Sequence, residues 1–373
     1  MRRKELPSIL FLYLTGFSFT GGIEKFNRSF LKALHELSVD DLIDADAFSS
    51  YDHQPDEKYF PRLRFKGFYG NRGFFVLYAI IKALRYNTVI IGHINLSLIG
   101  YIIKKIKPSV RIILITHGIE VWREQTGSKK KLLLLADNIV SVSNFTKQQL
   151  LQYNLGLDEQ KIKIFPNTID PYFKLPTLFT KPNYLLNRYN IPANKKVLLT
   201  VTRMAYSEKY KGYDDVIEAL SLLKNTRNDF VYLICGKAEN QEQERIEAII
   251  NQYQMWDYVK LIGYVNDNEL NDHYLLSDVF IMPSKKEGFG IVFIEALACG
   301  RPVIAGNKDG SIDALQNGKL GRLVDPDNIN ELEKAIADTL ALQHINSFTL
   351  QQEVLRAFDF KQYKTRLKKL LFA

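Results

Sequence analysis

Short apolar runs alternate along this chain with longer amphipathic stretches. The first apolar run, Ile9–Leu14, has the length of a buried strand. Residues 24–37 follow it, and their apolar side chains recur at helical spacing (Phe26, Phe30, Leu31, Leu34 and Leu37). The same pairing of a strand with a helix recurs up to residue 165. Alternation of this kind predicts a parallel, doubly wound sheet.

A turn-rich stretch with several prolines interrupts the pattern after Pro166, and the alternation resumes at Val197–Val201. Further strands are predicted at 230–235, 259–262, 279–282 and 302–305, and helices at 213–223, 241–253, 267–276, 291–298 and 330–342. We therefore expect an α/β fold with two Rossmann-like domains, residues 1–170 and 171–357. The amphipathic, lysine-rich C-terminal segment, about residues 358–373, is expected to pack back on the first domain.

The charge of the chain is unevenly placed. The formal net charge is +9, and residues 1–180 account for all of it, with 25 Lys and Arg against 16 Asp and Glu. Basic residues at 62–72 stand among aromatic ones, and Lys129–Lys131 form a further cluster. This combination suits an anionic membrane surface or a lipid-linked phosphate, although a basic surface that faces only water gives the same pattern. No nucleic-acid-binding motif is present, so we expect no nucleic acid partner.

The sequence also indicates where the protein works. No apolar run approaches the roughly 18 residues that a membrane-spanning helix needs. The stretch Ile9–Leu14 contains Tyr13 and lacks the features of a secretion signal. We therefore expect a cytoplasmic protein, peripheral at the inner face of the membrane if its basic half attaches there. Motifs of metalloproteases and serine hydrolases are missing, which argues against both classes.

A glycine-rich turn follows the predicted strand 279–282 and leads into the predicted helix 291–298. Doubly wound sheets bind ligands at the carboxyl ends of their strands. Glycines let the backbone approach a ligand closely, and the amides of a first helical turn can receive a phosphate. The candidate ligand contacts follow one another in sequence (Glu287, Gly288, Phe289, Gly290, Ile291 and Val292).

Glu295 lies inside the same predicted helix, which is otherwise almost wholly apolar. An ionised carboxylate is costly to bury there unless it has a hydroxyl or a cation as partner. The ribose of a nucleotide offers two neighbouring hydroxyls to such a carboxylate, while Glu287 could take sugar hydroxyls. The alternative is that Glu295 caps a backbone loop inside the protein.

The segment from Glu287 to Ala305 resembles the retaining glycosyltransferases of the GT-B fold, specifically family 4, also called group 1. Glu287 and Glu295 match the E-x7-E motif of that family, and the surrounding residues match almost throughout. The resemblance implies two Rossmann-like domains that face each other across a cleft, a nucleotide-sugar donor, and no metal or other cofactor. It also implies a front-face mechanism in which the departing phosphate takes the acceptor proton.

Further positions resemble site residues of the family. Gly21 and Gly22 follow the first strand, as does the glycine loop that meets the donor phosphate and the acceptor. His117 ends the strand 112–116, in the place of the active-site histidine that faces the donor sugar. A histidine that ends a strand and bonds a backbone carbonyl is the alternative. The segment that includes Val265 resembles the one whose backbone reads the base.

Arg203 and Lys211 resemble the paired cations that hold the diphosphate in this family. Negative charge builds on the leaving oxygen during transfer, and fixed cations stabilise it. The spacing between the two is longer than the commonest form, so Lys209 is a rival for the role of Lys211.

Two sequences depart from a simple interpretation. The family usually carries Gly-Gly-x-x-Glu where this chain has Asp309-Gly310-Ser311-Ile312-Asp313, which puts in doubt any contact assigned to the usual glutamate. Asp44-Ala45-Asp46 has the D-x-D spelling of a metal motif, but it stands in an acidic stretch that we interpret as a loop. We expect no metal there.

These features together predict a retaining hexosyltransferase. We expect transfer from UDP-glucose to a saccharide acceptor, lipid-linked, in the synthesis of a bacterial surface polysaccharide such as an exopolysaccharide. GDP-mannose and UDP-N-acetylglucosamine are the alternative donors. Two alternatives belong to other classes: a nucleotide-sugar epimerase, which needs no acceptor, and a non-catalytic membrane-associated binding protein.

Overall fold

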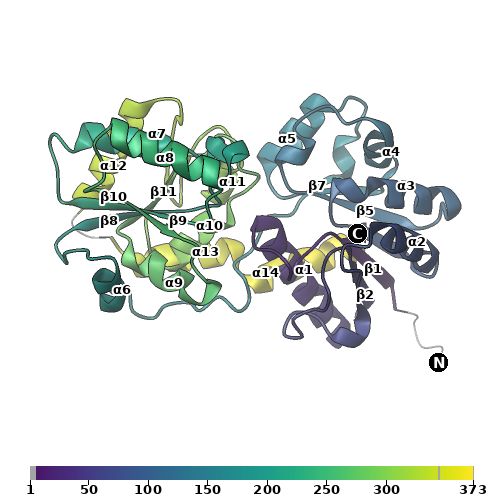
Figure 1. Ribbon diagram of the computed structural model, residues 1–373. Helices are drawn as coiled ribbons and strands as arrows, with labels where there is room; N and C mark the ends of the chain where they lie inside the picture. The colour runs from purple at the N-terminus through teal and green to yellow at the C-terminus, as the bar shows by residue number, and fades with distance from the viewer. Residues whose placement is uncertain (1–5, 343–344, 373) are drawn as a thin grey trace. The chain divides into compact units, whose positions relative to one another are not determined.

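The computed structural model describes residues 6–342 and 345–372. The chain divides into two compact units, drawn as a ribbon in Figure 1. One unit comprises the chain up to Pro171 together with the segment from Phe358, and the other runs from Tyr172 to Ala357. Residues 1–5, and Ala373 at the end of the expected C-terminal helix, lie outside the described residues.

The first unit is built on a parallel sheet. Within the described residues its strands have the order β3-β2-β1-β4-β5-β6-β7. The strands are β1 Ser8–Tyr13, β2 Asp44–Ser49, β3 Phe65–Gly67, β4 Thr88–Ile91, β5 Arg111–Thr116, β6 Asn138–Ser141 and β7 Ile162–Ile164. The helices are α1 Gly22–Val39, α2 Arg72–Ala83, α3 Ser97–Ile106, α4 Gly127–Leu135, α5 Asn144–Tyr153 and α14 Phe360–Phe372. Short 3-10 turns connect them (η1 Arg62–Arg64, η2 Ile94–Leu96, η3 Ile119–Val121 and η4 Glu159–Lys161).

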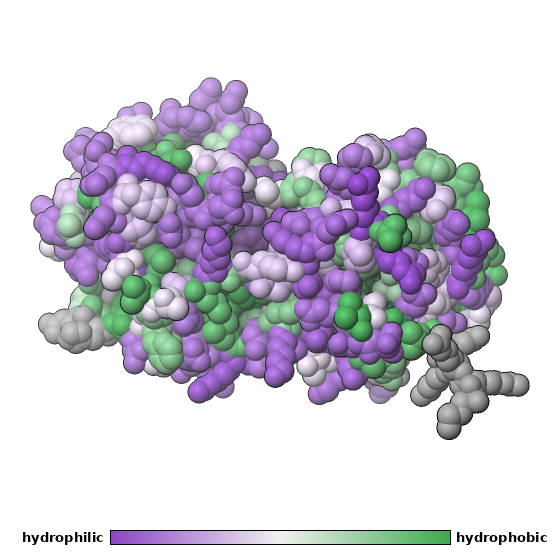
Figure 2. All heavy atoms as spheres, turned by 90° about the horizontal axis from the view of Figure 1, so that it is seen from below, coloured by the Kyte–Doolittle hydropathy of each residue, from purple (hydrophilic) through white to green (hydrophobic). Residues whose placement is uncertain are grey.

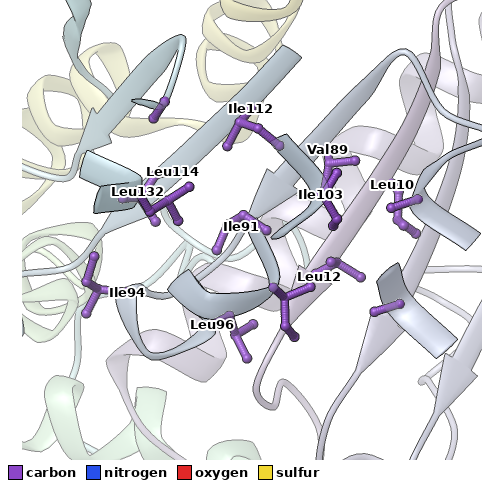
Figure 3. Packing of buried hydrophobic residues seen from close by; sticks show 14 of the residues in the cluster. Leu10, Leu12, Val89, Ile91, Ile94, Leu96, Ile103, Ile112, Leu114 and Leu132 are labelled. Carbon is purple, nitrogen blue, oxygen red and sulfur yellow. The ribbon is translucent and has the colours of Figure 1, made fainter. Parts of the chain in front are cut away.

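The core of the first unit joins the central strands to the helices that cover them. Figure 3 shows side chains of β1, β4 and β5 packed with those of η2, α3 and α4. Strands that are covered by helices on both faces need almost continuous apolar sequence, as in Ile9–Tyr13 and Ile112–Ile115, which are nearly inaccessible to water.

The C-terminal helix α14 packs on α1 of the first unit. Tyr363 is fully buried, with its ring centroid 4.5 Å from that of Phe165. Lys364 pairs with Glu36 of α1 at 2.9 Å, and Arg111 donates to the carbonyl of Leu371 at 2.8 Å. Chain segments that lie far apart in sequence thus share one core.

One prediction about this unit is wrong. Residues 44–46 form the start of β2 rather than a loop, because Ala45 and Ala47 face the core while Asp44 and Asp46 point outward. The two aspartates pair with Arg64, whose Nη2 lies 2.7 Å from Asp44. Arg64 is thus a basic partner of both carboxylates.

The second unit has a parallel sheet of its own, with the order β10-β9-β8-β11-β12-β13 in the described residues. Its strands are β8 Lys196–Val201, β9 Phe230–Cys235, β10 Val259–Gly263, β11 Val279–Met282, β12 Val303–Gly306 and β13 Arg322–Val324. Its helices are α6 Asn183–Arg188, α7 Tyr213–Leu223, α8 Asn240–Gln252, α9 Asp267–Leu276, α10 Ile291–Ala298, α11 Ser311–Ala314, α12 Ile329–Ala341 and α13 Ser347–Phe358, with a 3-10 segment η5 at Tyr206–Lys211. In Figure 1, α7, α8 and α12 cover one face of this sheet and α6, α9 and α13 the other.

Both units therefore have the predicted α/β fold of a doubly wound, Rossmann-like domain. Each strand order reverses at one point, between β1 and β4 in the first sheet and between β8 and β11 in the second. Loops diverge at such a switch point, and ligands bind doubly wound sheets there, outside the carboxyl ends of the strands. No helix in the described part of the chain is both long and apolar enough to span a bilayer.

Candidate functional site

Predicted site residues of the second unit gather at its switch point. Arg203 and Lys211 follow β8, and Glu287 follows β11, the neighbouring strand. Gly212, which follows Lys211, has a positive φ of 76°, and a Cβ there would lie 2.5 Å from the carbonyl oxygen of Pro283. The loops after the two strands therefore pack backbone against backbone, which brings Lys211 and Glu287 into contact although they lie far apart in sequence.

Lys211 and Glu287 form an ion pair. Lys211 Nζ lies 2.5 Å from Glu287 Oε2, and the two side chains are only 15% and 19% exposed. Burial lowers the pKa of Lys211, but the attraction to Glu287 outweighs it, so the pKa is raised overall and the ammonium stays charged. The sequence predicted both residues as site residues but not that they contact each other.

Arg203 and Lys209 are placed differently from Lys211. Arg203 is exposed and pairs with Glu208 of η5. Lys209 lies over the ring of Tyr206, with Nζ 3.5 Å from the ring centroid. Of the two rival lysines, only Lys211 contacts the glutamate of the glycine-rich turn in the described structure.

The glycine-rich turn closes tightly onto α10. Gly290 has a φ of 87°, and a Cβ there would lie 2.3 Å from the ring of Phe293. Gly288 and Phe289 are buried, and Phe289 is 1% exposed. α10 then begins at Ile291, and the first-turn amides of a helix, here those of Ile291 and Val292, have no partner inside the helix itself. The turn thus leads directly into the start of α10, where the sequence predicts an anion site.

Glu295 is buried at 1% exposure in α10 and has a protein partner. The hydroxyl of Tyr274, on α9, donates to Glu295 Oε2 at 2.8 Å. Burial and this carboxylate raise the pKa of Tyr274, so the phenol keeps its proton and remains a donor. A side chain of the protein therefore supplies one hydroxyl partner for Glu295, and a contact with ribose would be an additional one.

Val265 follows the end of β10 and is half-buried. Gly263, two residues earlier, has a φ of 71°, and a Cβ added to it would have no atom within 4 Å, so the turn is open there. Its carbonyl accepts a hydrogen bond from the amide of Gly236 at 2.8 Å. The segment follows β10, which is the edge strand of the sheet, and β9 and β8 separate β10 from β11.

Asp309 holds the glycine-rich turn in place and was noted in the sequence only as a departure from the family pattern. Asp309 Oδ2 accepts the amide of Glu287 at 2.7 Å, and the amide of Gly310 donates to the carbonyl of Glu287 at 2.7 Å. The backbone of Glu287 is thus fixed on both sides by one short segment between β12 and α11.

Gly21 and Gly22 lie at the start of α1, after the loop that leaves β1. Both are exposed, and the backbone of Gly21 is extended, with a φ of 169°. The side chain of Glu24 comes within 2.6 Å of where a Cβ of Gly21 would lie, whereas no atom lies within 4 Å of that position at Gly22. The helix start is therefore open at Gly22.

Asp52 anchors the loop between β1 and α1, and the sequence offered no signal for it. The carboxylate is fully buried and accepts the backbone amides of Gly16, Phe17 and Ser18 at 2.8 to 3.0 Å. It also accepts the hydroxyls of Thr15 and Ser49. Only an alignment or a structure could single out one aspartate after β2 for this role.

His117 follows β5 and is 9% exposed. Its Nε2 lies 2.8 Å from the carbonyl of Gly92, and since a carbonyl only accepts, Nε2 carries the proton. The ring of His93 stacks 5.9 Å away, and burial lowers the pKa of His93 to about 4, so His93 is neutral at neutral pH. His117 therefore makes the carbonyl contact of the alternative interpretation through its Nε2.

Metal ligands do not gather in the described part of the chain, where no three His, Cys, Asp or Glu side chains are placed to hold an ion.

Two family models match the chain. The model described as "Glycosyltransferase Family 4" matches residues 20–173, and "Glycosyl transferases group 1" matches residues 185–352. The second match contains Arg203, Lys211 and the glycine-rich turn, and the first contains His117 and the start of α1.

Relatives and solved structures agree with these matches. The chain is 24% identical over 300 residues to an uncharacterized 41.2 kDa protein in the cps region of Klebsiella pneumoniae, over 76% of this chain and 78% of that protein. It is 28% identical over 241 residues to a GDP-mannose-dependent alpha-(1-6)-phosphatidylinositol monomannoside mannosyltransferase of Mycobacterium tuberculosis, over 62% and 60% of the two chains, so the match spans about 60% of that relative.

The structure of Anabaena Alr3699/HepE in complex with UDP and glucose superposes with a TM-score of 0.74 at 19% identity, over 98% of this chain and 99% of that one. At that identity the likeness shows the fold, which is the GT-B fold of two Rossmann-like domains. With both family models in agreement, the chain belongs to the group 1 glycosyltransferases of the GT-B fold.

Proposed function

We propose that this enzyme transfers a hexose from UDP-glucose to a hydroxyl of a lipid-linked saccharide, with retention at the anomeric carbon, during the synthesis of a bacterial surface polysaccharide. The bond between the anomeric carbon and the β-phosphate oxygen breaks, and a bond to the acceptor oxygen forms. The acceptor proton passes to the departing diphosphate, so no protein nucleophile is required.

The observation that carries this proposal is the Lys211–Glu287 pair beside the start of α10. A diphosphate placed there would meet a charged ammonium and the amides of Ile291 and Val292. Fixed donors and cations of this kind stabilise the charge of a leaving diphosphate without reorganisation. Glu287 would then exchange part of its contact with Lys211 for hydroxyls of the sugar.

Further residues complete the proposed donor site. Arg203 would swing from Glu208 to the diphosphate, which its exposed position allows. Glu295 would bind the ribose while Tyr274 keeps its orientation. For the first unit, the roles expected of His117 and of the amides at Gly21 and Gly22 stay predictions from the family resemblance. The backbone at Val265 would read the base.

The choice of UDP-glucose is the finer part of the proposal, and GDP-mannose is its main rival. UDP is bound in the Anabaena structure, while the mycobacterial relative is named for GDP-mannose. A ligand present at 100 times its Kd stabilises the folded state by about 2.7 kcal/mol, so unfolding temperatures separate the donors. A screen with UDP-glucose, GDP-mannose and UDP-N-acetylglucosamine should give the largest rise for UDP-glucose, and a larger rise with GDP-mannose would overturn that choice.

Transfer is tested with labelled donor and an acceptor extract. Release of nucleotide that depends on the acceptor supports a transferase, whereas a modified nucleotide sugar formed from donor alone would indicate an epimerase. Proton NMR of the first product gives the anomeric configuration, and inversion would refute retention.

Membrane attachment belongs to the same proposal, and α2 supports it best. Phe74, Leu77 and Ile81 lie on one face of this helix and are 51%, 59% and 57% exposed. Figure 2 shows apolar residues gathered among hydrophilic ones along the right-hand edge of the view. Lys66 and Lys82 flank the face, both over the ring of Tyr78 at 4.4 and 5.4 Å. An apolar stripe with basic flanks suits an anionic bilayer.

The predicted cluster at Lys129–Lys131 is less suited to insertion. In α4, Lys130 pairs with Glu124 and Lys131 lies over Tyr101. We expect the double substitution Leu77→Gln and Ile81→Gln to abolish flotation with phosphatidylglycerol vesicles, and neutralisation of Lys129–Lys131 to weaken it only at low salt. Equal flotation of the α2 variant and the wild type would refute attachment through α2.

A further inference from the structure

We propose that Asp309 is a positioning residue that makes donor binding depend on pH: its ionised carboxylate holds the Glu287 turn in place, and its protonation releases the turn. The inference rests on the proposed function of that turn as part of the donor site. It concerns the segment where this chain departs from the Gly-Gly-x-x-Glu pattern.

The carboxylate of Asp309 is fully buried and joins two backbone segments. Its Oδ2 accepts the amide of Glu287 at 2.7 Å, and its Oδ1 accepts the amide of Ser311 at 2.9 Å. The amide of Gly310 completes the contact by donating to the carbonyl of Glu287 at 2.7 Å. A Cβ on Gly310 would lie 2.1 Å from the carbonyl oxygen of Gly288, so the two segments leave no space between them.

This geometry is best satisfied by the ionised form. Each oxygen of Asp309 accepts one N–H group, and an ionised carboxylate is acceptor-only. A neutral carboxyl carries a proton on one oxygen, and that O–H would face the amide of either Glu287 or Ser311. A buried amide without an acceptor is costly, so protonation loosens the hold on one of the two segments.

The charge on Asp309 is poorly compensated inside the protein. Burial raises its pKa to about 7 from an ordinary value of 3.8 and outweighs the hydrogen bonds from Ser311, which lower the pKa, while the nearby Glu287 carboxylate raises it further. The groups that face Asp309 are the Glu287 turn, whose side chain is paired with Lys211 of η5, and the Ser311 backbone of α11. The protonation that loosens the turn therefore falls near neutral pH.

Stability and donor binding should respond to pH with opposite signs. The folded-state pKa of Asp309 lies above its unfolded value, so this group stabilises the fold most when it is protonated, and that contribution is lost as the pH rises from about 4 to about 7. Donor affinity should instead rise over the upper part of this range, as the ionised fraction rises. A residue with only a structural role would move both quantities in the same direction.

The test compares donor affinity at different pH values in the full chain. With a pKa of about 7, the ionised fraction falls from about 0.9 at pH 8 to about 0.1 at pH 6, and an apparent Kd scales inversely with the competent fraction. We expect the wild type to bind UDP-glucose and GDP-mannose up to about tenfold more weakly at pH 6 than at pH 8 by calorimetry. These sugar diphosphates keep a constant charge in that range.

Asp309→Asn is the informative variant, because its amide has one acceptor and mimics the neutral carboxyl. It should bind donor at the weak level of the wild type at pH 6, with that tenfold dependence lost. Asp338→Asn is the matched control, because Asp338 is an exposed carboxylate on α12 that pairs with Arg322. The donor affinity of this control should equal that of the wild type at every pH.

A carboxyl-carbon NMR titration of the wild type provides a measurement that does not depend on the folding of a variant. One aspartate should titrate near pH 7, above Asp215, whose pKa burial raises to about 6. Titration of every aspartate below about pH 6, or the same pH dependence of affinity in Asp309→Asn as in the wild type, would overturn the inference and leave the proposed function intact. If the wild type binds no sugar nucleotide at any pH, the proposed function fails, while the NMR titration still reports the state of Asp309.

Discussion

Replacing Asp52 by Asn should destabilise the first unit by about 2 kcal/mol. In the wild type, Oδ1 accepts Thr15, Phe17 and Ser18, and Oδ2 accepts Gly16 and Ser49. The carbonyl of Asn can keep the three bonds of Oδ1. Its NH2 group replaces Oδ2 and faces the amide of Gly16, which then has no acceptor.

The expected magnitude follows from that one lost acceptor. An unsatisfied buried amide costs about 1–3 kcal/mol. The Ser49 hydroxyl can turn to accept a hydrogen bond from the new NH2 group, so its changed contact adds little to the loss of stability. Loss of charge assistance in the remaining bonds is offset in part because a buried charge is removed. The loop from Thr15 to Ser18 leads to Gly21 and Gly22, so transfer should fall together with stability.

Tryptophan fluorescence can report the unfolding of one unit of this chain at a time. Its two tryptophans are Trp122 in the first unit and Trp256 in the second. In a Trp256→Phe background, fluorescence reports the first unit alone, which avoids treating a two-unit protein as two-state. With a urea m-value of about 2 kcal/mol/M, a loss of about 2 kcal/mol lowers the midpoint by about 1 M.

The matched control is Asp56→Asn, an exposed carboxylate close in sequence that pairs with Lys58 at 3.1 Å. Exposed pairs contribute about 0–1 kcal/mol, so its midpoint should barely change. A loss below about 0.5 kcal/mol for Asp52→Asn would refute the reasoning, because the amide of Gly16 would then have found another acceptor.

Three further comparisons test the second unit and its site. Lys211→Ala should lower transfer by about 10²–10³-fold if it removes a cation from the diphosphate, and Lys209→Ala should leave it within about threefold; the reverse order would move the role to Lys209. Glu295→Gln should weaken donor binding with turnover of bound donor retained, and unchanged donor Kd would exclude a ribose contact. Gly290→Ala places a Cβ 2.3 Å from the Phe293 ring, so it should lower thermal stability more than Gly127→Ala does. Gly127 also has a positive φ, of 57°, but a Cβ added there would have no atom within 4 Å. Equal losses of stability would mean that the Phe293 ring moves freely.

Elements with a clear periodicity could be predicted from the sequence to within a residue or two. The predicted helices 213–223, 267–276 and 291–298 coincide with α7, α9 and α10. β2 was missed because its two aspartates obscured the alternation. α2 was missed for the opposite reason, since it carries apolar side chains on its exposed face as well as its buried one and lacks the usual amphipathic contrast.

The positions of the candidate site residues could be predicted from the sequence, but their contacts could not. Residues that follow strands of a doubly wound sheet must lie at its ligand edge, and Arg203, Lys211 and Glu287 do lie there. That Lys211 pairs with Glu287, or that Glu295 accepts from Tyr274, depends on how loops and helices pack after folding. Neither contact has a spacing that the sequence could reveal.

Asp52 and Asp309 suggest why the loops at both switch points are held by a buried carboxylate from a neighbouring loop, after β2 and after β12 respectively. A loop that offers backbone amides to an anionic ligand has few backbone acceptors of its own, because it belongs to no strand or helix. A buried aspartate satisfies the amides that point inward, three in the case of Asp52 and two for Asp309, and fixes the direction of the loop. Asp309 also faces the carboxylate of Glu287, whereas Asp52 accepts two hydroxyls in addition to its amides. Control of the loop by protons is therefore expected in the second unit, where the carboxylate has fewer donors to balance its charge.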